Sequence, residues 1–69
     1  MGTLRIRHSG QDYVVDEEDT GAEVKRKLNI SPEFMVVNSE GEQLSDHQRA
    51  GDVLEDGDAV MPLVQPRYG

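Results

Sequence analysis

The sequence contains no cysteine. Disulfide bonds and thiolate zinc sites are therefore excluded, and so is catalysis by a cysteine nucleophile. The chain is also short: we expect its 69 residues to form one domain, and a domain of this size buries only about 60% of the surface that its unfolded chain exposes. The hydrophobic core must stabilise the fold alone, and we expect no bound metal.

Basic residues are scarce. Fourteen Asp and Glu residues against seven Lys and Arg residues give a formal net charge of -7, and the only lysines are Lys25 and Lys27. Negative charge repels a phosphate backbone and favours basic partner surfaces, so we do not expect nucleic acid as a ligand. An acidic composition with little lysine also suits a protein that stays soluble in high salt, and halophily is a hypothesis here.

Long apolar runs are missing as well. No stretch approaches the roughly eighteen residues of a membrane span, and the first nine residues lack the apolar segment of a signal peptide. We therefore expect a cytoplasmic protein. The sequence shows no Ser-His-Asp signature, phosphate loop or paired-carboxylate cleft, and His8 and His47 have no second ligand at a readable spacing. We expect a protein that is not an enzyme and needs no cofactor.

The first half of the chain predicts a hairpin followed by a helix. Apolar and polar residues alternate over residues 3–8, and β-branched and aromatic residues return at 13–16 after a polar turn. Thr20 and Glu23 then have the spacing of a capping box, which predicts a helix over residues 21–28. Its buried stripe is Ala22 or Val24 with Leu28, its basic residues 25–27 favour the negative end of the helix dipole, and Asn29 with the Ser31–Pro32 pair ends it.

The second half predicts three further strands. Residues 34–37 form an apolar run typical of a buried strand, and a short strand ends at Leu44 after a turn. Residues 45–54 predict a loop with one short turn. The acidic turn at residues 55–58, in which Gly57 supplies a positive φ, leads into a last strand over 59–64. Pro62 donates no hydrogen bond there, so it must lie at an outward-facing or bulged position. If the last strand instead lies between two neighbouring strands, its pairing must slacken near Pro62.

This order of elements is that of an α+β protein with the β-grasp fold, in which a mixed sheet wraps one helix. The first and last strands of that fold pair in parallel at the centre of the sheet, and the helix crosses one face. We therefore expect four residues of these two strands to meet beneath Val24 and Leu28. They are Leu4, Ile6, Val60 and Val64.

The segment "VKRKLNISPEFMVVNSEGEQL", the turn "EDGDAV" and the glycine end resemble the ubiquitin-like proteins of prokaryotes, which include the sulfur carriers ThiS and MoaD and the small archaeal modifier proteins. Members of that family carry a tail ending in Gly-Gly, whose carboxylate is adenylated by an E1-like activating enzyme. The carboxylate then becomes a thiocarboxylate or is joined to a lysine of a target protein. The resemblance covers residues 3–69.

The resemblance implies a domain over residues 1–64 and a tail over 65–69. In the tail, Gly69 would be the activated residue, with Arg67 and Tyr68 presenting it to the enzyme. The implied partners are an adenylating enzyme and target proteins, the implied state is a monomer, and Lys25 and Lys27 are candidate acceptor lysines.

Other interpretations remain open. The family has glycine at the penultimate position, where this chain has Tyr68, which favours a non-conjugated adaptor that binds proteins through its sheet surface. An RNA-contacting β-grasp domain should carry a basic stripe, and this chain has few clustered cations. The four carboxylates at residues 16–19 suit either a solvated loop before the helix or a docking patch for a basic partner.

Overall fold

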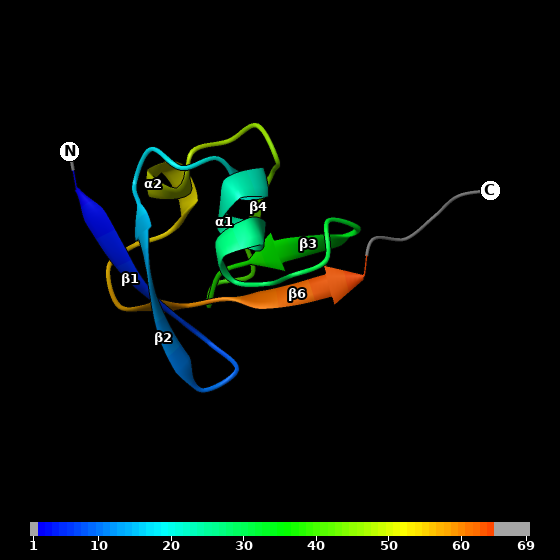
Figure 1. Ribbon diagram of the computed structural model, residues 1–69, viewed down its shortest axis with the longest axis horizontal. Coiled ribbons are helices and arrows are strands. Elements are labelled where there is room, and N and C mark those ends of the chain that lie inside the picture. Colours follow the sequence, from blue (N-terminus) through cyan, green and yellow to red (C-terminus); the bar gives the residue numbers. More distant parts are fainter. Residues whose placement is uncertain (1, 65–69) are drawn as a thin grey trace.

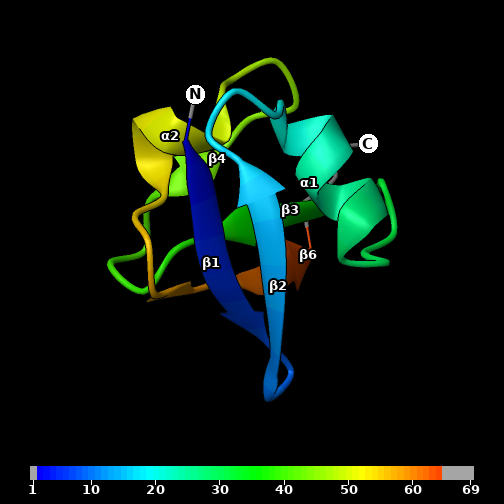
Figure 2. The same cartoon turned by 60° about the vertical axis from the view of Figure 1, so that its left-hand side comes forward.

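A computed structural model gives the fold of residues 2–64. Two three-stranded sheets and two helices make up the molecule (Figures 1 and 2). One sheet has the order β2-β1-β5 and the other the order β4-β3-β6. The α+β class expected from the sequence is confirmed. No helix among residues 2–64 is long and apolar enough to cross a membrane.

The hairpin forms as predicted, with a longer second strand. Strand β1 (Thr3–His8) pairs antiparallel with β2 (Gln11–Asp16), which begins two residues before the expected position 13. The two connecting residues, Ser9 and Gly10, have φ values of 53° and 76°. Two consecutive positive φ values match the right-handed twist of the paired strands, as in the commonest tight hairpins.

Helix α1 (Gly21–Lys27) begins and ends as the sequence predicts. The Glu23 amide donates to the Thr20 hydroxyl, and the Glu23 carboxylate accepts from the Thr20 amide, so the capping box is present. At the other end Asn29 has a φ of 60°, and the Ile30 amide donates to the Lys25 carbonyl over 2.8 Å. A left-handed residue followed by this bond is a common helix terminator, and asparagine tolerates that conformation.

Gly21 permits a close approach between α1 and the segment after β4. A side chain at this position would collide with the carbonyl oxygen of Ser45. The Gly21 amide also donates to the carbonyl of Gln48 over 2.9 Å. The start of the helix is therefore fixed to a segment 24 to 27 residues later, at a close approach that only glycine allows.

The prediction of a loop over residues 45–54 is wrong in part. Strand β3 (Phe34–Val37) pairs with the short strand β4 (Gln43–Leu44) as expected, but a one-turn helix, α2 (Ala50–Val53), follows. Ala50 and the C-cap Leu54 lie one turn apart and are 0% and 2% exposed. Two apolar residues with this spacing are too few to predict a helix, which forms here because both are buried in the core.

The last strand is divided between the two sheets. Strand β5 (Asp58–Ala59) pairs in parallel with β1, and the Val60 amide donates to the carbonyl of Arg7 over 2.9 Å. Strand β6 (Met61–Val64) then pairs antiparallel with β3. The expected parallel pairing of the first and last strands is confirmed, although it is confined to the first half of the last strand.

One core of apolar side chains lies between the sheets and α1. Its members come from both helices and from the strands and loops around them: Leu4, Ile6, Val15, Val24, Leu28, Ile30, Val36, Leu44, Ala50, Leu54 and Val60. The prediction that Val64 belongs to this core is wrong, because its side chain is 76% exposed. Beyond Val60 the strand has left β1, so β6 extends past the side chains that cover the core.

Pro62 lies where its missing N–H costs no hydrogen bond. The amide of Asn38 donates to Glu42, on the β4 side of β3, and by the alternation of a strand the amide of Val36 points the same way. Val36 lies opposite Pro62, so these two residues form a pair without backbone hydrogen bonds between them. The proline nitrogen faces the other edge of β6, which has no strand neighbour among residues 2–64. The expected outward-facing position is confirmed.

Candidate functional site: the outer face of the sheets

The face of the two sheets that points away from α1 carries exposed apolar side chains. Leu4 and Ile6 of β1 are buried towards the helix, so the alternation of the strand points Arg5 and Arg7 to the other side. We call this side the outer face. Its members within the paired strands include the exposed or partly exposed residues Arg5, Arg7, Val14, Met35, Ala59, Met61 and Leu63, and also Val37, which is buried.

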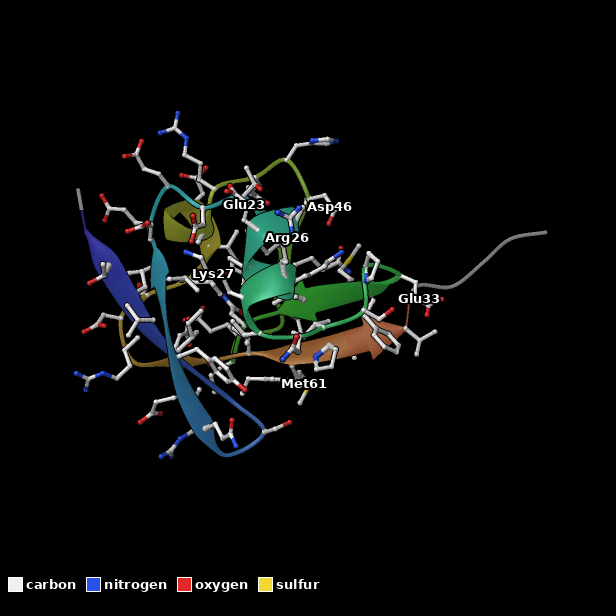
Figure 3. All side chains as sticks on the ribbon, viewed as in Figure 1. Glu23, Arg26, Lys27, Glu33, Asp46 and Met61 are labelled. Atoms are coloured by element: carbon white, nitrogen blue, oxygen red, sulfur yellow. The ribbon has the colours of Figure 1, made fainter. Side chains whose placement is uncertain are left out.

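Strand β6 supplies the apolar centre of the outer face. Met61 is 56% exposed and Leu63 is 45% exposed, and they lie opposite Val37 and Met35 of β3. Figure 3 shows the Met61 side chain on the side of β6 away from the helix. Methionine and leucine side chains that are neighbours on an exposed sheet face are typical of a protein contact surface.

The sequence predicts Val60 and Val64 as inward-facing residues of the last strand, but Met61 and Leu63 between them were not singled out. The signal was present in the alternation. Once Val60 is buried, residues 61 and 63 must point to the opposite side of the strand. Val14, which is 62% exposed, extends the outer face onto β2 beside Arg5.

The candidate acceptor lysines differ in their surroundings. The Lys25 ammonium is buried, with a side chain only 4% exposed, and it donates to Asp46 Oδ1 over 2.6 Å and to the carbonyl of Pro32 over 3.2 Å. The Lys27 side chain is 44% exposed and contacts Asp19. Lys27 is the more accessible of the two amines, and the acceptor role of both remains a prediction.

The acidic segment at residues 16–19 is more than a solvated loop. Asp19 is buried, and its Oδ2 accepts hydrogen bonds from the Lys27 ammonium over 2.5 Å and from the Asp16 amide over 3.0 Å. Burial raises the pKa of the Asp19 carboxyl, but these hydrogen bonds outweigh it, so that the net pKa lies below the ordinary value. The hydrogen bond to Asp19 raises the pKa of Lys27. Asp19 fixes the entry to the helix.

Two of the three carboxylates of the turn at residues 55–58 accept hydrogen bonds from the fold itself. Asp56 Oδ1 accepts the Arg5 amide over 2.8 Å, and the two oxygens of Asp58 accept the Ser39 hydroxyl and the Glu55 amide. Gly57 has a φ of 89°, as the turn prediction requires. Within residues 2–64 no group of three or more His, Cys, Asp or Glu side chains has the geometry of a metal site.

A groove of about 510 Å³ lies at the C-terminal end of α1 and is lined by Ala22, Lys25, Arg26, Asn29, Ile30, Ser31, Pro32 and Asp46. The buried Lys25 ammonium in this groove already donates hydrogen bonds to Asp46 and to the Pro32 carbonyl.

The predicted tail residues Arg67, Tyr68 and Gly69 lie outside the described residues. Comparison with models of protein families and with curated protein sequences found no match.

Proposed function

We propose that this protein is a ubiquitin-like β-grasp protein that acts as a modifier or sulfur carrier, activated at Gly69 by an adenylating enzyme. One observation supports the proposal most strongly. The first strand lies in parallel beside the first half of the last strand, one main helix packs on the inner side of the sheets, and the last strand carries the exposed apolar residues of the outer face.

The position of β6 links the outer face to the proposed tail. Met61 and Leu63 lie on the last described strand, a few residues before Gly69. Five extended residues span at most about 17 Å. An enzyme that covers the outer face would therefore need its ATP site within about 17 Å of Val64, and binding of β6 would bring the terminal carboxylate close to the nucleotide.

The proposal is tested by incubating the full chain with ATP and a ThiS- or MoaD-type adenylating enzyme and measuring the intact mass. We expect an acyl-adenylate on Gly69, or a thiocarboxylate when a sulfur donor is supplied. Reactions without ATP, and reactions of a variant that lacks Gly69, are the controls. An unchanged mass with adenylating enzymes of both types would contradict the proposal.

A non-conjugated adaptor is the second candidate. It is favoured by the outer face, which is complete within residues 2–64 and needs no free terminus, and by Tyr68 at the position where the family has glycine. Removal of residues 65–69 distinguishes the two functions. An adaptor would bind its partner with unchanged affinity after the truncation, whereas a carrier would lose its activation.

A further inference from the structure

A cationic hollow opens on the outer face between β1 and β5. It is lined by Arg5, Ile6, Arg7 and Asp12 together with the small residues Gly57 and Ala59. Its volume is about 380 Å³. The hollow exists because the strand beside the two arginines carries almost no side-chain volume at this point.

The charges of the two arginines contribute little to the fold, as do those of Arg26 and Arg49, but only Arg5 and Arg7 lie together at a hollow of the outer face. Arg7 Nε lies 3.5 Å from Asp12 Oδ1, but the two side chains are 65% and 57% exposed, and such surface pairs contribute little. Within residues 2–64, Arg5 has no carboxylate within 4.0 Å of its guanidinium. By contrast, both lysines are paired with carboxylates that are part of the fold.

We propose that this hollow receives the carboxylate of an Asp or Glu side chain from a partner protein segment, while apolar neighbours of that side chain pack on Met61, Leu63 and Val14. The carboxylate matches the planar donors of two guanidinium groups. The apolar contacts match the side chains that the outer face exposes. This inference rests on the proposed function, because it names the chemistry of the protein partner that function requires. It does not require activation of Gly69.

A protein segment fits this surface better than nucleic acid does. Binding along a phosphate backbone needs several cations, each of which neutralises a phosphate. The hollow has two arginines with Asp12 of the adjacent strand β2 in its lining, and the whole chain has a net charge of -7. The exposed apolar residues of the outer face would find no partner on a phosphate backbone, whereas they match leucine or isoleucine side chains of a protein.

The test uses a phage-displayed library of random twelve-residue peptides, selected on the full chain. We expect the enriched peptides to contain Asp or Glu with a large apolar residue within two positions. Enrichment of basic peptides, or of peptides without any acid, would overturn the proposal. So would tighter binding of an oligouridylate than of the enriched peptides.

Two double variants with equal net charge then locate the contact. Arg5→Gln with Arg7→Gln removes the cations of the hollow, while Arg26→Gln with Arg49→Gln removes two exposed cations from the helices. Figure 3 shows Arg26 on α1, on the opposite side of β6 from Met61. We expect the first pair to weaken binding of an enriched peptide about tenfold or more, and the second pair to change it less than twofold. Equal weakening by both pairs would mean that the hollow is not the site.

An exchange of charges between the hollow and the peptide tests the contact by a gain of binding, which small losses of folded protein cannot produce. A variant with Arg5→Glu and Arg7→Glu should reject the acidic peptide and bind the same peptide with its acid replaced by lysine. Failure of this exchange, with circular dichroism unchanged, would contradict the proposal. Peptide binding does not involve Gly69. An unchanged mass in the adenylation experiment would therefore contradict the proposed function, whereas a failure of peptide binding would contradict the proposal for the hollow.

Discussion

Two charged side chains, Lys25 and Asp19, are held inside the fold by partners that are distant in sequence or across a turn. Lys25 contacts Asp46, which is 21 residues away, and Asp19 contacts Lys27 on the facing side of α1. The sequence predicted only that Lys25 favours the negative end of the helix dipole and that residues 16–19 form either a solvated loop or a docking patch. Neither burial was predictable, because local patterns contain no information about which distant side chain lies opposite.

The Lys25–Asp46 pair predicts unequal effects of its two partners on stability. Asp46→Ala would leave the buried ammonium with the Pro32 carbonyl alone, and we expect a loss of about 2–4 kcal/mol in the free energy of unfolding. Lys25→Met would leave Asp46, whose side chain is 52% exposed and can be hydrated, so we expect a change within about 1 kcal/mol. Urea denaturation at pH 7 measures both variants. Equal losses in the free energy of unfolding would show that an unpaired Lys25 ammonium destabilises the fold no more than an unpaired Asp46 carboxylate.

Asp19 predicts a specific pH dependence. Because its folded pKa lies below the unfolded value of about 3.9, ionised Asp19 stabilises the fold above that pH, and the contribution is lost as the pH falls through the folded pKa. Asp19→Asn should cost about 1 kcal/mol at pH 7, a modest value because Lys27 is partly exposed. The difference from wild type should shrink below about pH 4.

The measurement is the free energy of unfolding of both proteins between pH 7 and pH 2.5. Glu18→Gln is the matched control, because Glu18 is exposed and immediately precedes Asp19. A constant difference between wild type and Asp19→Asn across this range would contradict the assignment of a lowered pKa.

At the scale of secondary structure, elements that depend on local contacts were predictable. The capping box between Thr20 and Glu23 and the stop at Asn29 define α1 within ten residues of sequence, and the structure has both. By contrast, α2 and the division of the last strand at Val60 depend on burial and on which strand lies alongside. A pattern of alternating residues identifies the two sides of a strand, but it does not say where a neighbouring strand ends.

The free edge of β6 predicts an effect of Pro62 on self-association. The proline nitrogen faces the unpaired edge of an exposed apolar strand, where an N–H would invite pairing with a second molecule. We expect Pro62→Val to shift the protein from monomer towards dimers or larger species at about 100 µM, because the substitution adds a donor to the edge. Analytical ultracentrifugation measures the shift.

Pro32→Val is the matched control for this experiment. It replaces an exposed proline in the turn before β3 and adds no donor to a strand edge. If both variants remain monomeric, the edge is protected by something other than Pro62.

For the whole molecule, the balance of charges predicts that salt stabilises the fold. With 14 acidic and seven basic residues, repulsion among carboxylates opposes compaction, and dissolved ions screen it. The same ions weaken exposed attractive pairs, but only the Arg7–Asp12 pair has both side chains mostly exposed within residues 2–64. We therefore expect the melting temperature to rise by several degrees between about 0.05 and 1 M NaCl.

Potassium chloride is the comparison salt, since a general screening effect should be the same for both. A melting temperature that falls with either salt would show that attractive pairs outweigh repulsion. It would also remove the physical basis for the hypothesis of halophily.

The division of the last strand at Val60 also determines how the domain resists a mechanical load. Tension applied to the chain beyond Val64 is directed along β6, where it would shear four antiparallel residue pairs with β3 together. Once these yield, only two parallel residue pairs between β1 and β5 remain in line with the pull. An unfolding machine that grips this end would therefore meet its main barrier at the first step, and the rest of the domain would follow without a second one.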